Sequence, residues 1–222
     1  MSVENKEFSL LIIFDFDGVL ADSQEAYAMQ MFETVEFFTN KQIPMEVFKQ
    51  RGGNTDQRQD FIEFLETDDP ETIDKAIIYY VSLTEKYSYL RELYPNVSKT
   101  LESLKEKYIL GIVSRKSQER LMKWLRHFKI THLFDKFIGT LEQSKCSAIQ
   151  EIMADFNIPS ERTLMVGDTE FDIISAQEAG ISSVLALYGA EKIAKALALS
   201  PTYTIQSVED VIEIARKHIE SI

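Results

Sequence analysis

The feature that most constrains this chain is a short apolar run that ends in two aspartates. Residues 10–14 read LLIIF, and Asp15, Asp17 and Gly18 follow directly. Such a run is long enough for a buried parallel strand, and glycine lets the backbone leave the strand sharply. Burying an ionised carboxylate costs free energy unless a cation or a metal compensates it, so the two aspartates either meet solvent or hold a cation. The motif alone equally fits an acidic turn, because Asp and Gly both favour turns.

The rest of the chain alternates between helical and strand patterns. Helical periodicity alone fills residues 22–93. Beyond them, strand patterns lie at 108–113, 134–138, 163–166, 183–187 and 203–205, and helical patterns lie between and after them. This order predicts an α/β fold, with a Rossmann-like parallel sheet core, helices on both faces and an inserted all-helical cap domain. We expect residues 1–21 and 94–222 to form the catalytic core and residues 22–93 to form the cap, which would act as a lid.

The net charge and the cysteine count limit the classes of binding partner and the cellular compartment that we expect for this chain. The formal net charge of −12 argues against nucleic acid and anionic membranes, because no basic field recruits phosphates. The single cysteine, Cys146, excludes an internal disulfide framework. The first ten residues lack a secretory pattern, and no run reaches the roughly 18 apolar residues of a membrane span, so a cytoplasmic protein is expected. An anionic small substrate would need a divalent cation or lysines nearby.

Two later stretches place an anion-binding side chain where a strand gives way to a helix. Ser114 ends the apolar stretch 109–113, and Lys145 opens the helical stretch 145–156. The serine is a candidate phosphate donor beside exposed backbone amides, although alone it equally fits a helix cap. The lysine is unfavourable near the positive end of a helix dipole, which suggests an anion close by, although surface lysines are common.

A second acidic strand end follows at residues 167–172, which read GDTEFD. Asp168 directly follows the strand pattern, and Asp172 lies one helical turn later on the same side. Acidic residues in a first helical turn are ordinary capping chemistry. Two strand ends that carry carboxylates in one parallel sheet are harder to explain by capping alone, because both ends lie at the same edge.

The four stretches together resemble the signature of the haloacid dehalogenase-like superfamily. The pattern is DxD, then Ser, then Lys, then GDxxxD, and it extends over nearly the whole chain. Its order and the cap most resemble the subgroup that contains phosphoglycolate phosphatases, sugar-phosphate phosphatases and β-phosphoglucomutase. Two positions depart from the frequent family pattern, because Arg115 stands where Asn is common and Cys146 stands where Pro is common.

The resemblance implies a nucleophile, an acid–base residue and a metal. Asp15 would attack phosphorus and form an aspartyl-phosphate. Asp17 would protonate the leaving oxygen and later deprotonate water, a role that requires its neighbours to raise its pKa. The implied metal is Mg²⁺, held by the Asp15 carboxylate, the Asp17 backbone carbonyl and the Asp168 carboxylate.

The resemblance also implies how the phosphoryl group is held. Ser114 and Lys145 would bind its oxygens, where charge is spread in the transition state. Asp172 would orient Lys145 or a metal-bound water without touching the substrate. Cys146 is interpreted as a small helical residue, because no partner for thiol catalysis is evident in the sequence.

Three basic residues are candidate contacts for the part of the substrate beyond the phosphate. Arg115 either touches the leaving group or faces solvent. In the cap, Arg51, beside the Gly52-Gly53 pair, and Arg58 either bind a substrate carboxylate or second phosphate, or pair with neighbouring acids. We therefore include Arg51, Gly52 and Arg115 among the predicted substrate-binding residues.

Three functions remain open from sequence. The first is Mg²⁺-dependent hydrolysis of a small phosphorylated metabolite, such as phosphoglycolate, a sugar phosphate or a nucleoside monophosphate. The second is a phosphoryl-transfer mutase, but Tyr27 stands where that family carries a histidine, which counts against it. The third is a catalytically silent binding or regulatory protein, which the intact set of site residues disfavours. Dehalogenation is disfavoured because Asp17 is present. Either a monomer or a homodimer is compatible with the sequence.

Overall fold

A computed structural model describes residues 10–51, 57–140, 143–189 and 193–222. The chain forms two compact units: residues 1–21 with 93–222, here called the sheet unit, and residues 22–92, here called the helical unit. The chain crosses between them at two short paired strands, β2 (Ala21–Asp22) and β3 (Glu92–Leu93). The sequence did not predict this pair, because two residues are too few to show a strand pattern.

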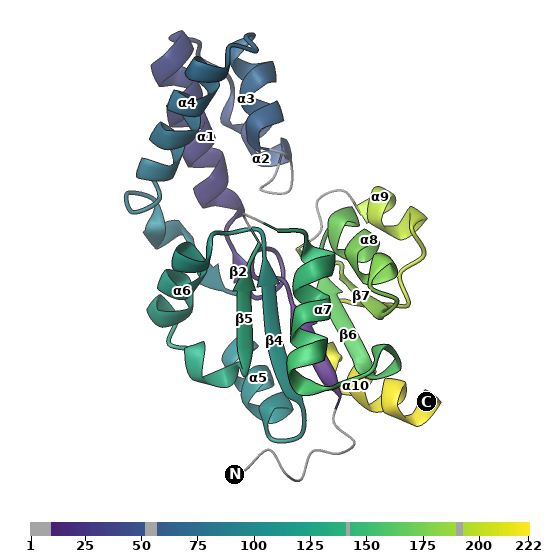
Figure 1. The fold of residues 1–222 in the computed structure, drawn as a ribbon. Helices are drawn as coiled ribbons and strands as arrows, with labels where there is room; N and C mark the ends of the chain where they lie inside the picture. The colour runs from purple at the N-terminus through teal and green to yellow at the C-terminus, as the bar shows by residue number, and fades with distance from the viewer. Residues whose placement is uncertain (1–9, 52–56, 141–142, 190–192) are drawn as a thin grey trace. The chain divides into compact units, whose positions relative to one another are not determined.

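The sheet unit is built on six parallel strands (Figure 1), which confirms the predicted α/β fold. Their spatial order is β5–β4–β1–β6–β7–β8. The strands are β1 (Leu11–Phe14), β4 (Ile109–Ser114), β5 (Lys136–Gly139), β6 (Thr163–Gly167), β7 (Ser182–Ala186) and β8 (Tyr203–Ile205). The chain builds outward from β1 to β4 and β5, then returns to place β6 on the other side of β1. Ligands bind at such a switch in strand order, outside the carboxyl ends of the strands.

Helices cover both faces of this sheet because alternate side chains of each strand point to opposite faces. Ile12 and Phe14 of β1 belong to a core with α5 (Val97–Lys105), α6 (Gln118–His127) and α10 (Asp210–Ser221). Leu11 and Ile13 belong to a second core with α7 (Lys145–Phe156) and α8 (Glu170–Glu178). A further helix, α9 (Ile193–Ala198), packs with α8 and β7. All four residues of β1 are fully buried, as the apolar run predicts.

One strand begins later than its pattern predicts. The sequence places a strand at 134–138, whereas β5 covers Lys136–Gly139. Residues Thr131–Leu133 form a 3₁₀ turn, and Phe134 is buried in the core at the end of that turn. Its apolar character therefore reflects core packing and not membership of the strand.

The helical unit contains α1 (Gln24–Thr39), α2 (Met45–Arg51), α3 (Gln57–Leu65), α4 (Pro70–Ser82) and a 3₁₀ turn at Ser88–Leu90. Local signals set its boundaries: Asn40, in the left-handed conformation, ends α1, and the Asp69 side chain accepts a hydrogen bond from Thr72 N at the start of α4. Its core includes Phe48, Phe61, Ile73 and Tyr80. In the described parts of the chain, every helix is too short or too polar to cross a membrane.

Candidate active site

Three neighbouring strands carry predicted site residues at or just past their carboxyl ends: Asp15 and Asp17 after β1, Ser114 in β4 and Asp168 after β6. Phe14 of β1 pairs with Ile112 of β4 on one side and with Val166 of β6 on the other. Ser114 and Asp168 each lie two residues beyond those partners, so both lie level with the chain just past the end of β1. Three motifs that are far apart in sequence therefore meet at the switch in strand order, as the fold predicts.

Asp15 is the central carboxylate of this edge. Its Oδ1 accepts a hydrogen bond of 2.7 Å from Phe16 N, and its Oδ2 lies 2.8 Å from Lys145 Nζ. Burial raises the pKa of Asp15 to about 6, although the Lys145 cation opposes the shift; Asp172 and Asp17 add to it. At neutral pH the carboxylate is therefore ionised, buried and poorly hydrated, which suits a nucleophile.

Lys145 bridges two carboxylates. It is the first residue of α7, and its ammonium lies 2.8 Å from Asp15 Oδ2 and 2.6 Å from Asp172 Oδ1. Burial alone would lower the pKa of Lys145, but the two facing carboxylates raise it above its ordinary value. The lysine is therefore a fixed cation beside Asp15, which explains its place in a first helical turn where the dipole disfavours it.

Asp172 holds this lysine in place. Its side chain is fully buried in the first turn of α8, and its Oδ2 accepts hydrogen bonds from Thr169 N at 3.1 Å and Thr169 Oγ1 at 2.7 Å. Its Oδ1 contacts Lys145. One oxygen of Asp172 caps α8, as the capping interpretation predicts, and the other contacts Lys145, the residue that it was predicted to orient.

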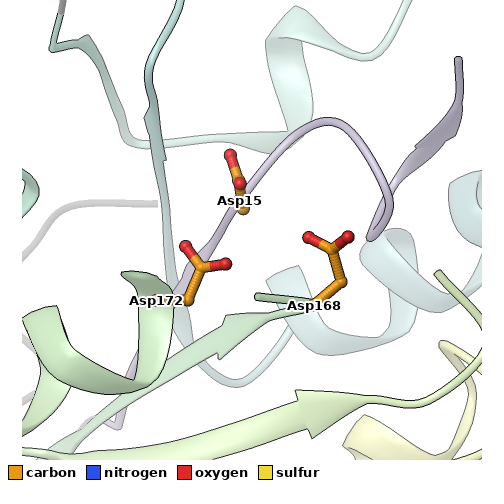
Figure 2. Close-up of side chains that lie close together, drawn as sticks. All are labelled: Asp15, Asp168 and Asp172. Carbon is orange, nitrogen blue, oxygen red and sulfur yellow. The ribbon is translucent and has the colours of Figure 1, made fainter. Parts of the chain in front are cut away.

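Three carboxylates cluster closely enough to hold a metal ion. Oxygen atoms of Asp15, Asp168 and Asp172 lie within 4.8 Å of one another, and Figure 2 shows these side chains beside each other at the ends of β1 and β6 and on α8. Both oxygens of Asp172 already accept from protein donors. Both oxygens of Asp15 are likewise engaged, Oδ1 by Phe16 N and Oδ2 by Lys145, and hard oxygen donors of this kind suit Mg²⁺.

Two glycines allow the carboxylates to come this close. Gly18 has a φ of 75°, and a Cβ there would lie 2.1 Å from Asp168 Oδ2. A Cβ on Gly167 would lie 2.1 Å from Asp172 Cβ. Any side chain at either position would displace a carboxylate of the cluster, so both motif glycines have a packing reason.

Ser114 is a strand residue and does not cap the following helix. It ends β4, is 1% exposed, and its backbone oxygen accepts from Thr140 N at 2.7 Å. Ser117 caps α6 instead, with its side chain accepting from Arg120 N. The alternative interpretation of Ser114 as a helix cap is therefore wrong, and its buried hydroxyl lies at the strand edge.

The second aspartate of the first motif has a partner that sequence reasoning missed. The Asp17 carboxylate forms an ion pair with Lys116 Nζ, and the Lys116 side chain is 4% exposed. Asp17 is not among the three carboxylates of the cluster, and its side chain contacts a buried lysine. No sequence signal names Lys116, because a lysine between a strand and a helix is ordinarily a surface residue.

The predicted substrate-binding residues Arg115 and Arg51 are not buried among the carboxylates described above. Arg115 is exposed, with its guanidinium 5.2 Å from the centre of the Phe171 ring. Arg51 pairs with Asp60 and Glu63, and Arg58 pairs with Asp74, so both follow the alternative of pairing with neighbouring acids. Gly52 lies outside the described residues. Burial raises the pKa of the Cys146 thiol, which agrees with a helical residue and not a nucleophile.

Comparison with known proteins assigns the family. A family model described as haloacid dehalogenase-like hydrolase matches residues 12–186. The chain belongs to the haloacid dehalogenase-like hydrolase family. This match confirms the resemblance inferred from the four motifs and the prediction of a hydrolase.

Similar proteins agree with this assignment. The chain is 30% identical to a phosphoglycolate phosphatase of Haemophilus influenzae (strain 86-028NP), over 83% of this chain and 88% of the relative. It is 25% identical to the pyrophosphatase PpaX of Bacillus mycoides (strain KBAB4), over 91% and 95% of the two chains. It superposes with a TM-score of 0.81 on the crystal structure of a predicted phosphoglycolate phosphatase from Haemophilus somnus, at 25% identity over 93% and 97% of the chains. This superposition over nearly the full length of both chains shows that the two proteins share one fold.

Proposed function

We propose that this haloacid dehalogenase-like hydrolase is a Mg²⁺-dependent phosphatase that hydrolyses a small phosphomonoester through an aspartyl-phosphate. The observation that carries the proposal is the contact of Asp15 with Lys145, because a buried carboxylate beside a buried cation is the arrangement that a nucleophile of this kind requires. A phosphoryl oxygen bound by that cation would bring phosphorus next to the Asp15 carboxylate. The names of the relatives support the same reaction class.

The reaction divides into two steps. A carboxylate oxygen of Asp15 attacks phosphorus while the ester bond to the leaving oxygen breaks, and Asp17 donates a proton to that oxygen. Water then attacks the phosphorus of the aspartyl-phosphate, Asp17 takes up its proton, and the Asp15 carboxylate is released with inorganic phosphate. Because Asp17 ends each cycle with its proton restored, the same residue serves as acid and then base.

The residues around Asp15 fit a magnesium ion. Asp15, Asp168 and the Asp17 backbone carbonyl would hold it, while Asp172 is already engaged by Lys145 and Thr169. The ion would supply charge neutralisation between the carboxylate and the phosphate. Gly18 has no side chain, and a Cβ at this position would clash with the Asp168 carboxylate, so the glycine allows that carboxylate to lie at the site.

Two side chains would bind the transferred phosphoryl group. Lys145 already lies beside the Asp15 carboxylate, and the Ser114 hydroxyl is buried at the end of the adjacent strand. Both are held by their surroundings, Lys145 by Asp172 and Ser114 by its place in β4. Donors that are fixed in advance stabilise the developing charge without reorganisation.

The substrate is a small phosphorylated molecule. One relative is named for phosphoglycolate and another for pyrophosphate, so these two compounds head the panel, together with sugar phosphates and nucleoside monophosphates. The experiment measures phosphate release from each compound with Mg²⁺, and Asp15→Asn protein serves as the blank.

The proposal expects Mg²⁺-dependent turnover of at least one compound and none above background with the Asp15→Asn blank. Equal rates for the two proteins would refute the assignment of Asp15 as nucleophile. Absence of turnover on the whole panel by a folded, Mg²⁺-loaded protein would favour the catalytically silent alternative.

A further inference from the structure

A buried lysine faces the second aspartate of the site. Lys116 lies between β4 and α6, and its ammonium contacts the Asp17 carboxylate. The side chains are 4% and 16% exposed, respectively. Lysine is almost never fully buried without a partner. The pair is therefore built into the site, and its lysine is a different residue from the one that contacts Asp15.

We propose that Lys116 is a positioning residue that holds the Asp17 carboxylate in the orientation from which it exchanges a proton with the leaving oxygen. The inference rests on the phosphatase function proposed above. It assigns a role to a residue that the four sequence motifs leave out. Three features of the site support this role. The backbone at Lys116 is fixed, such a buried pair contributes little to the stability of the fold, and each of the two aspartates contacts a different lysine.

The backbone that carries Lys116 is locked against the end of β5. Gln118 Nε2 donates to Phe137 O at 3.1 Å, and Gly139 N donates to Gln118 Oε1 at 2.7 Å. A Cβ on Gly139 would lie 2.5 Å from Lys116 O, so the two segments are in direct backbone contact. The Lys116 ammonium also lies 5.7 Å from the centre of the Phe16 ring. A cation fixed by its backbone and by packing can orient a carboxylate that a mobile surface lysine cannot.

Stability alone gives little reason for this pair. The desolvation cost of two buried charges commonly cancels their attraction, and an apolar pair of similar volume often stabilises a fold as well. The sheet unit already has apolar partners at this place, since Phe16 is fully buried in its core. The presence of the Lys116–Asp17 pair close to Asp15 is therefore better explained by an effect of Lys116 on the orientation of Asp17.

The two aspartates of the first motif are each given a cation of their own. Asp15 contacts Lys145 of α7, whereas Asp17 contacts Lys116 of the β4–α6 connection. Two carboxylates two residues apart would otherwise compete for one ammonium. Separate cations hold Asp17 in one direction and leave Asp15 to attack phosphorus, which matches the distinct roles of nucleophile and acid–base residue.

The test compares two substrates that differ in their need for a proton. An alkyl phosphate turned over in the panel releases an alkoxide that must be protonated, whereas p-nitrophenyl phosphate releases a stable phenolate. In Lys116→Met protein, we expect the rate of leaving-group release in the first turnover to fall about 100-fold for the alkyl ester, as for loss of proton transfer, and less than about threefold for the aryl ester. Asp17→Asn protein should show the same split, Lys116→Arg should recover part of the alkyl activity, and Lys99→Met on the exposed surface of α5 should match wild type.

A double variant separates action through Asp17 from direct action on the phosphate. If Lys116 acts through Asp17, adding Lys116→Met to Asp17→Asn should change kcat by less than about twofold, because coupled residues are not additive. An equal loss on both esters in the first turnover, or an undiminished loss in the Asp17→Asn background, would overturn the proposal.

A structural measurement tests the same inference without activity. Crystal structures of wild-type and Lys116→Met protein should show one orientation of the Asp17 carboxylate in the first and a rotated one in the second. An unchanged Asp17 in the variant would overturn the proposal. If wild-type protein hydrolyses no compound of the panel, the proposed function fails, and this comparison still decides the positioning role of Lys116.

Discussion

The cations that face the candidate site in the sheet unit and the arginines predicted to bind substrate in the helical unit have different surroundings. In the sheet unit, the side chains of Lys145 and Lys116 are 5% and 4% exposed and face carboxylates of the site. In the helical unit, the side chains of Arg51 and Arg58 are 31% and 43% exposed and pair with acids of the same unit. Buried pairs are costly and are kept where chemistry needs them, whereas exposed pairs contribute little.

This difference separates the chemical step from the choice of substrate. The residues proposed for phosphoryl transfer are already assembled in the sheet unit by their mutual contacts. In the helical unit, the two arginines predicted to bind substrate are paired with acids of that unit. We therefore expect large effects from changes at the sheet edge and small effects from the arginines of the helical unit.

The largest effect is expected from Asp15→Asn. The amide has nearly the same shape, but it cannot attack phosphorus, so kcat should fall at least about 10⁴-fold on every ester. Steady-state rates on the panel measure the loss, and thermal melting checks that the variant folds. Retention of a tenth of the wild-type rate would place the nucleophile elsewhere.

Lys145→Met should have the next largest effect. It removes the cation between Asp15 and Asp172, so we expect kcat to fall about 10³-fold and the free energy of unfolding to fall by about 3 kcal/mol, because two buried carboxylates then face each other. Steady-state rate assays measure the loss of kcat, and urea denaturation measures the loss of unfolding free energy.

Asp172→Asn is the matched control for this variant. It keeps Lys145 but weakens its orientation, so a smaller loss of about 10- to 100-fold is expected. A Lys145→Met protein with wild-type activity would show that the buried cation serves the fold alone and would remove the contrast between the two units.

Lowering the pH should weaken the affinity for Mg²⁺ moderately. The pKa of Asp15, about 6 in the metal-free protein, lies above the ordinary value because of burial, so a proton competes with the metal as the pH falls. Affinity should be about tenfold weaker at about pH 5 than at about pH 7, since one proton must leave Asp15. Calorimetric titration at both pH values measures this ratio. A Mg²⁺ affinity that does not change over this range would show that Asp15 is not a ligand.

The smallest effect is expected from Arg51→Met. Arg51 contacts Asp60 and Glu63 and lies over the Phe64 ring, so its loss should lower the free energy of unfolding by no more than about 1 kcal/mol and change kcat/KM by less than about threefold. Competition assays with esters that carry a carboxylate or a second phosphate measure the change. A large rise in KM for those esters alone would show that Arg51 leaves its acids to bind substrate, as first predicted, and would make the helical unit part of the binding site.

The fold and most of the candidate site follow from the sequence because strand ends are easy to recognise. The buried run before Asp15 and the short apolar run before Asp168 mark two strand ends, and the carboxyl ends of parallel strands meet at one edge. The position of Lys145 in a first helical turn pointed to a nearby anion, and the structure supplies two.

Other features depend on geometry that a single sequence does not show. The partner of Lys116 is fixed by how the β4–α6 connection packs against Gly139, which leaves no pattern in the residue types. The capping role of Ser114 was wrong because the strand continues to it and Ser117 opens the helix. For Arg51, the many acids of the chain favoured pairing with neighbouring acids over a substrate anion, and the α2–α3 contacts show which acids these are.

The most direct test of the central claim is to trap the covalent intermediate. Protein loaded with Mg²⁺ is mixed with a turned-over ester, quenched in acid within the first turnover, digested and analysed by mass spectrometry. We predict one phosphoryl group on the peptide that contains Asp15, located on Asp15 by fragmentation and absent from Asp15→Asn protein. A phosphoryl group on Asp17 or Ser114, or turnover with no phosphorylated peptide at any quench time, would contradict the account.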